Sequence, residues 1–119
     1  MKLLISSLAA LGAATFATAP AALAKDRTVR CVIVSPGSNV YRGPCRFLPE
    51  QGGTFTVTPL PGQEFPSGHT GIQVNIVERG VAEVYGLTPT GPASRWGTAV
   101  RSRRDRACWE GPDFSICAY

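Results

Sequence analysis

Apolar and polar residues alternate in two stretches near the middle of the chain, residues 72–77 and 81–87. This period of two is typical of β-strands with one buried face. Because only residues 78–80 separate the two stretches, we predict a β-hairpin. A three-residue loop sets Ile76 opposite Ala82, whereas a two-residue loop would set Ile76 opposite a glutamate. The apolar pattern therefore selects the three-residue loop, whose glycine suits the left-handed position.

Similar stretches, rich in β-branched and aromatic residues, predict further short strands. They cover residues 28–35, 40–48, 54–58 and 95–101, followed by a closing hairpin. Residues 59–71 form the longest irregular segment, which we expect to be a surface loop. No stretch after residue 24 shows sustained helical periodicity. We therefore predict an all-β fold, a small antiparallel sandwich or barrel of about seven short strands.

The closing hairpin has residues 111–113, Gly-Pro-Asp, as its predicted turn. Pairing across this turn sets Cys108 directly opposite Cys117, and Trp109 opposite Ile116. Opposed residues on antiparallel strands have Cα atoms about 4.5–5.5 Å apart, a separation that a disulfide accepts. The cysteines and the apolar pair thus favour the same register.

A first hairpin is predicted around Ser38, inside the turn cluster Pro-Gly-Ser-Asn. Centring the hairpin on Ser38 pairs Cys31 with Cys45. Pro44 cannot donate a hydrogen bond to a neighbouring strand, so we expect this strand at a sheet edge or with a bulge. Four cysteines permit three connectivities. We favour two hairpin staples over the chief rival, a bond from Cys31 to Cys117 that would tie the ends of the domain together.

The first 24 residues match a secretory signal peptide. A basic start precedes an apolar run, residues 3–15, and Ala-Leu-Ala at 22–24 fits the A-x-A cleavage rule. The apolar run is shorter than the ~20 residues that a bilayer span needs, and the residues before Cys31 do not resemble a lipoprotein cleavage box. We therefore expect one exported domain, residues 25–119, periplasmic or secreted, with no membrane span and no lipid anchor.

Charge and cysteine usage narrow the class of protein. Removing Lys2 with the signal peptide leaves 11 basic and 8 acidic residues, a net charge of +3. This net charge is too small for the dense clusters of lysine and arginine that are typical of a nucleic-acid-binding protein. An even number of cysteines in a small exported domain indicates disulfides. Metal ligation and redox activity are disfavoured, because the chain has no C-x-x-C and His69 is its only histidine. We expect no cofactor and a monomer.

Two arrangements of residues could suggest catalysis. Ser67 and His69 lie two residues apart, but the chain has no G-x-S-x-G elbow. A catalytic histidine must also be oriented by a third group and held rigidly, whereas we expect this loop to be flexible. Glu110 and Asp113 could imitate a glycosidase pair, but a domain of this size barely supplies a cleft for a sugar chain. We therefore expect a solvent-exposed loop histidine, turn-forming acids, and no enzyme.

Residues 101–106 carry four arginines against a single acid, Asp105. The segment is either a solvated turn between strands or a patch that contacts anions, since arginine forms bidentate bonds with carboxylate and phosphate. The aromatic residues are expected mainly as core anchors rather than as an exposed binding surface. We expect any binding site to involve Arg95, Arg101, Arg103 and Arg104.

Four blocks of the sequence resemble those of small, uncharacterised exported bacterial proteins: YRGPCRF (41–47), GVAEVYGLT (80–88), SRWG (94–97) and DRACW…DFxICAY (105–119). The resemblance implies a periplasmic or secreted location and transfers no activity and no site residue. A looser similarity connects the chain to the C-type lysozyme-inhibitor barrels of bacterial envelopes, which are small exported β-domains with a disulfide. Their Ser-Gly-x-x-Tyr segment corresponds only loosely to residues 93–96.

These features suggest a non-enzymatic, disulfide-stapled binding module of the cell envelope, whose partner is a protein or an anionic envelope component. The alternative is a periplasmic inhibitor of a lysozyme or protease, which would insert residues 59–71 or 94–97 into the cleft of the enzyme. A small hydrolase that uses His69 is the third hypothesis.

Overall fold

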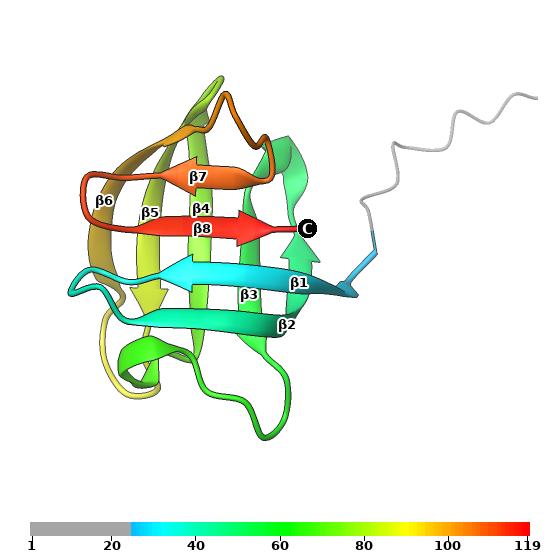
Figure 1. Cartoon of the computed structure of the whole chain (residues 1–119), viewed down its shortest axis with the longest axis vertical. Coiled ribbons are helices and arrows are strands. Elements are labelled where there is room, and N and C mark those ends of the chain that lie inside the picture. The colour runs from blue at the N-terminus through cyan, green and yellow to red at the C-terminus, as the bar shows by residue number, and fades with distance from the viewer. Residues whose placement is uncertain (1–24) are drawn as a thin grey trace, which may run out of the picture.

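The computed structural model describes residues 25–119, which form a closed barrel of antiparallel strands (Figure 1). The strands are β1 (Arg27–Val34), β2 (Val40–Pro49), β3 (Phe55–Pro59), β4 (Gly71–Glu78), β5 (Val81–Leu87), β6 (Ser94–Arg101), β7 (Cys108–Glu110) and β8 (Ser115–Ala118). Two short 3₁₀ turns, η1 (Gln51–Gly53) and η2 (Pro66–Gly68), lie in the β2–β3 and β3–β4 connections. The all-β prediction is confirmed, as a barrel rather than a sandwich. The predicted signal peptide lies outside the described residues.

The barrel closes because its first and last strands pair with each other. Ile33 of β1 lies opposite Ile116 of β8, and each remaining pair joins strands that follow one another in the chain. Closure removes the unpaired sheet edges that invite aggregation. Antiparallel neighbours place their connections alternately at the two ends of the barrel. One end carries the β2–β3, β4–β5 and β6–β7 connections with the start of β1 and the end of β8 (Figure 1). Within residues 25–119, no helix is long and apolar enough to cross a membrane.

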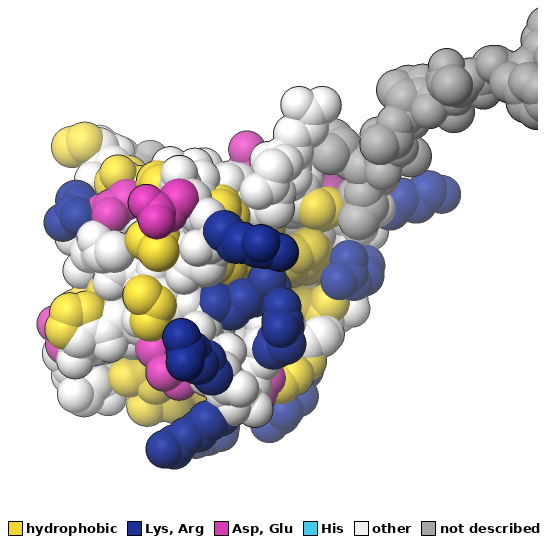
Figure 2. All heavy atoms as spheres, turned by 90° about the horizontal axis from the view of Figure 1, so that it is seen from above, with side chains coloured by type: hydrophobic (Ala, Val, Ile, Leu, Met, Phe, Trp, Pro, Cys, Tyr) yellow, Lys and Arg dark blue, Asp and Glu magenta, His cyan; other side chains and the backbone are white. Residues whose placement is uncertain are grey.

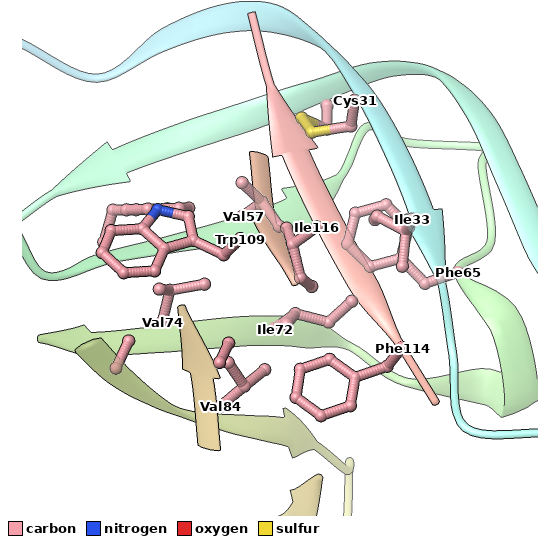
Figure 3. Close-up of a cluster of buried hydrophobic side chains, with 14 residues drawn as sticks. Cys31, Ile33, Val57, Phe65, Ile72, Val74, Val84, Trp109, Phe114 and Ile116 are labelled. Atoms are coloured by element: carbon pink, nitrogen blue, oxygen red, sulfur yellow. A yellow bond between two sulfur atoms is a disulfide. The ribbon is translucent and has the colours of Figure 1, made fainter. Parts of the chain in front are cut away.

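Alternate residues of the strands fill the barrel with an apolar core, whose side chains point toward one another in Figure 3. Its largest fully buried members are Ile33, Ile72, Ile116, Val57, Val74 and Val84. Burying such a side chain stabilises the fold by about 1.5–3 kcal/mol. The expected core position of Trp109 is confirmed, since 3% of it is exposed. Trp96 is only half-buried and packs against Phe114 at the margin of the core, with ring centroids 5.7 Å apart.

The β4–β5 hairpin has the predicted register. Ile76 lies opposite Ala82, so the apolar side chains of both strands share the inner face. The connection is tighter than predicted, because Glu78 also pairs with Val81 and a bulge forms between Ile76 and Glu78. Gly80 has a φ of 74°, the left-handed conformation that favours glycine.

Both favoured disulfides are present. In the closing hairpin Cys108 lies opposite Cys117, with Cα atoms 4.0 Å apart, and Trp109 lies opposite Ile116. The other staple is Cys31–Cys45. The alternative disulfide, Cys31–Cys117, which would tie the ends of the domain together, is wrong, because each cysteine bonds to a partner within its own hairpin.

The register of the first hairpin differs from the prediction by two residues. Cys31 lies opposite Gly43 rather than opposite Cys45, which instead faces Val29. The hairpin is centred on Gly37, whose φ of 100° a residue with a side chain rarely adopts. The disulfide therefore runs diagonally across the pair, and the strand twist brings its Cα atoms to 5.8 Å, within disulfide range.

The expectation that Pro44 marks an edge strand or a bulge is wrong. Strand β2 lies between β1 and β3, and its register with β1 is unbroken. Pro44 is tolerated because of where its nitrogen points. The carbonyl of Arg30, its partner on β1, accepts the N–H of Tyr119, so Arg30 directs its backbone groups toward β8. The nitrogen of Pro44 therefore faces the side of β3, which ends at Pro59 opposite Cys45.

Candidate functional site

Basic side chains collect at the barrel end that carries the β2–β3, β4–β5 and β6–β7 connections, which we call the basic end. Seen from above, over the β4–β5 turn and the β6–β7 loop, lysine and arginine side chains gather on one part of the surface (Figure 2). The arginines that line hollows at this end are Arg27, Arg79, Arg101, Arg103 and Arg106. They come from three parts of the chain: the start of β1, the β4–β5 turn, and the end of β6 with the β6–β7 loop. The β5–β6 pairing joins the second part to the third, and barrel closure adds the first.

Two adjoining hollows at the basic end, of about 520 and 500 Å³, share most of their lining. We call the pair the basic groove; it is lined by Arg79, Gly80, Arg101, Ser102 and Arg103, with Arg106 in one hollow and Glu110 in the other. Four guanidinium groups thus face one carboxylate. The groove carries a positive field that attracts anions.

Internal hydrogen bonds hold the β6–β7 loop in a defined shape. The hydroxyl of Ser102, which is 6% exposed, accepts the backbone N–H groups of Arg104 and Asp105 at 3.1 and 3.2 Å. The N–H of Ser102 donates to the carbonyl of Cys108 at 2.9 Å. Because Ser102 is buried beneath the loop, Arg103 and Arg104 are held exposed on its outer side. The arginines are therefore presented by an ordered turn.

The single acid of this loop is occupied by internal bonds. The carboxylate of Asp105 accepts the N–H of Ala107 at 3.0 Å and the hydroxyl of Tyr119 at 2.6 Å. The bond to Asp105 raises the pKa of the Tyr119 phenol above its ordinary value of 10.0. Within residues 25–119 the only ion pair is that of Arg95 with Glu83. Asp105 therefore forms no ion pair with the arginines around it.

Arg101 is positioned before any ligand arrives. Its Nε donates to the carbonyl of Arg106 at 2.9 Å, and its Cζ lies 5.1 Å from the centre of the Trp109 ring. A guanidinium above an indole face gains a favourable cation–π interaction. Among the described residues, the terminal nitrogens of Arg101 have no hydrogen-bond partner in the protein.

Arg95 lies apart from the other three predicted site residues. It is six residues from Arg101 on the extended strand β6, a separation of about 20 Å along the strand. Its guanidinium binds the carboxylate of Glu83, which also accepts the hydroxyl of Thr98 at 2.6 Å. The Thr98 hydrogen bond, with help from Arg95, lowers the pKa of Glu83. The structure thus unites Arg101 and Arg103 in one groove, places Arg104 in the same loop, and excludes Arg95.

His69 is partly buried, rather than solvent-exposed as predicted. Its ring stands edge-on to Trp96, with centroids 5.4 Å apart, and its Nδ1 lies 2.7 Å from the carbonyl of Pro66. Because a carbonyl can only accept, Nδ1 carries the proton in this contact. In the described chain no hydrogen bond joins His69 to Ser67, so the arrangement that would activate a serine nucleophile is not formed there.

Sequence reasoning did not single out Arg27 or Arg79, which lie far along the chain from the arginine-rich loop. Each is an isolated arginine beside a strand end, and no local signal distinguishes it from a solvated side chain. No group of three or more His, Cys, Asp or Glu residues within 25–119 is placed to hold a metal ion. Comparisons with protein-family models, with curated proteins and with solved structures found no match to this chain.

Proposed function

We propose that this protein is a non-enzymatic, exported binding module that holds an anionic partner against the basic groove. One observation carries the proposal: four arginines, from the β4–β5 turn and from the end of β6 with the loop that follows, line one groove. None of them has an ion-pair partner within residues 25–119. Four clustered cations beside a single carboxylate, Glu110, repel one another and lower stability. A bound anion would remove that repulsion and form charge-assisted hydrogen bonds.

The shape of the groove favours a macromolecular partner. It is an open hollow on the surface of the barrel end, and its cations belong to exposed side chains. Such a surface suits successive carboxylates or phosphates of a polymer or a membrane surface. The partner class is therefore an acidic protein segment or an anionic component of the cell envelope.

The proposed location is the periplasm or the exterior of the cell. Two disulfides and a complete absence of free cysteines in residues 25–119 fit an oxidising compartment. The N-terminal segment that matches a secretory signal peptide supports the same location.

The test is binding of the purified mature domain to phosphatidylglycerol vesicles and, separately, to polyglutamate. We expect binding that weakens as salt rises and that falls about tenfold or more in the Arg103→Glu/Arg104→Glu variant. The matched control is Arg42→Glu/Arg46→Glu, which makes the same change in net charge on the exposed wall of β2. Equal losses in both variants would show a general charge effect, and binding of neither probe would refute the proposal.

A second candidate function, inhibition of a lysozyme or protease, is favoured by the β3–β4 loop. Phe65 anchors the loop: it is 2% exposed, and its ring stands edge-on to Tyr41 at 5.1 Å. The N–H of Gln63 donates to the carbonyl of Leu60 at 2.9 Å, and residues 61–64 are exposed. A pre-organised projecting loop is what a cleft-blocking inhibitor needs. Residues 94–97, the other segment predicted for this role, form the start of strand β6 rather than a loop.

Inhibition of a panel of lysozymes and proteases tests the second candidate. Inhibition at roughly nanomolar concentration, typical of tight protease inhibitors, that is lost in Gln63→Ala/Glu64→Ala would support it. Failure against the whole panel would count against this second candidate.

A further inference from the structure

Three valines lie side by side on the outer wall of the basic end, one on each of three neighbouring strands. Val81 of β5 lies opposite Val100 of β6, and Val77 is the extra residue of the β4 bulge beside Val81. Val77 and Val100 are each 52% exposed, and Val81 between them is half-buried. Single exposed apolar residues are ordinary, whereas contiguous ones mark interaction sites. We call these three residues the valine patch.

The valine patch adjoins the basic groove. Val100 lines one of the two hollows of the groove together with Arg79, Arg101 and Arg103. The N–H of Arg101 donates to the carbonyl of Gly80 at 3.0 Å, so the β4–β5 turn that carries Arg79 lies against the end of β6. In the view from above, apolar side chains lie next to the gathered lysine and arginine side chains (Figure 2). Apolar and cationic groups therefore share one continuous surface.

Cations outnumber acids around the valine patch. The neighbouring acids are Glu110, which lies opposite the β6 valine, and Glu78 at the end of β4; both are exposed. Four arginines line the groove, and a fifth, Arg104, is exposed in the same loop. The acid within that loop, Asp105, is occupied by internal hydrogen bonds. The surface is thus both apolar and net positive.

This combination favours a membrane over an acidic protein segment as the partner. A run of carboxylates would pair with the arginines and leave the valines in water. An anionic bilayer offers both kinds of contact, because its phosphate groups lie directly above its acyl chains. Guanidinium groups form bidentate hydrogen bonds with phosphate. Binding at a membrane interface also grows with the apolar area that is buried, in addition to the electrostatic attraction.

We propose that the basic end docks on the surface of an anionic membrane, with the arginines of the basic groove at the lipid phosphates and with Val77 and Val100 among the upper parts of the acyl chains. This inference rests on the proposed function, because it assigns an occupant to the same groove. Each arginine near an anionic leaflet strengthens binding about fivefold. The two exposed valines together contribute a smaller factor, about fivefold, because the protein already covers half of each side chain.

The experiment measures binding of the mature Val77→Thr/Val100→Thr variant to phosphatidylglycerol vesicles and, separately, to polyglutamate. Threonine keeps the β-branched shape of valine and replaces one methyl by a hydroxyl, so the strands are preserved. We expect about fivefold weaker binding to the vesicles and unchanged binding to polyglutamate. Unchanged polyglutamate binding also shows that the variant is folded. The matched control is Val40→Thr, because Val40 is 53% exposed and lies at the opposite end of the barrel; it should change neither.

A second measurement locates the valines in the bilayer. Bromine atoms on the acyl chains quench a tryptophan that enters the hydrocarbon, and tryptophan is a favoured anchor at the membrane interface. In Val100→Trp we expect quenching by brominated phosphatidylglycerol beyond that of the parent protein, with binding about tenfold tighter. Val40→Trp should show neither effect.

Three results would overturn the inference: vesicle binding of Val77→Thr/Val100→Thr equal to that of the parent protein, an equal loss of polyglutamate binding in the same variant, or no added quenching in Val100→Trp. Binding to polyglutamate without binding to vesicles would refute membrane docking and leave the basic groove as a site for acidic protein segments. Binding to neither probe would refute both proposals.

Discussion

Gly86 of β5 is buried at a point where the barrel wall has no room for a side chain. A Cβ added there would lie 2.4 Å from the His69 ring and 2.6 Å from Nε1 of Trp96. Overpacking of this kind costs about 1–3 kcal/mol. Alanine gains about 0.4–1 kcal/mol over glycine by restricting the unfolded chain. We therefore expect Gly86→Ala to lower the free energy of unfolding by about 1–2 kcal/mol.

Guanidinium chloride denaturation of a double-mutant cycle measures this effect. His69→Ala removes the nearer of the two obstructing rings, so Gly86→Ala should be less harmful in the His69→Ala background. The rescue should be incomplete because Trp96 remains. The matched control is Gly91→Ala, where the nearest atom to the added Cβ, Oγ1 of Thr88, lies at an ordinary 3.4 Å; it should be neutral or slightly stabilising.

Additivity of the two substitutions within about 0.3–0.5 kcal/mol would refute the packing argument, since non-interacting sites behave in that way. A Gly86→Ala variant as stable as the parent protein would refute it more directly. Either result would mean that His69 and the β3–β4 loop do not lie against β5 as described.

Two further predictions concern stability. The phenol of Tyr119 has a raised pKa in the folded protein, chiefly through its bond to a carboxylate, so the stability it contributes is present below pH 10.0 and is lost as the pH rises through the higher folded value. Thermal unfolding between neutral and strongly alkaline pH should therefore show a steeper loss in the parent protein than in Tyr119→Phe; parallel curves would contradict the bond. Replacing Cys31 and Cys45 together by alanine opens a loop with a sequence separation of 14, and should lower the free energy of unfolding by about 2–4 kcal/mol. Chemical denaturation measures this change, and a loss under about 1 kcal/mol would contradict a staple.

Local sequence patterns were sufficient to predict the strand register of most of the hairpins. In the β4–β5 hairpin a one-residue slip would turn Ile76 out of the core, so the alternation selects one register. The closing hairpin was predictable for the same reason, with the added constraint that Cys108 and Cys117 must meet. The fold class, the strands and both disulfides follow from such short-range constraints.

The first hairpin shows where this reasoning ends. The predicted and observed registers differ by two residues, and a two-residue slip leaves every side chain on the same face. The apolar pattern could not distinguish the two registers. The disulfide could not distinguish them either, because Cys31 and Cys45 can bond although they do not lie directly opposite each other. The turn around Gly37 decides between the two registers through its backbone conformation.

The sequence by itself determined an all-β domain with two hairpin staples, because those features depend on residues close together in the chain. Only the tertiary structure decided that the sheet closes between β1 and β8, a pairing of strands from opposite ends of the domain. Closure also decided the candidate site. It brings Arg27 to the same hollow as Arg101. The β5–β6 pairing sets the β4–β5 turn with Arg79 beside Arg101, and it places Arg95 next to Glu83 elsewhere on the wall. Isolated arginines carry no local signal of their neighbours, so their grouping emerges only when long-range strand pairing places them.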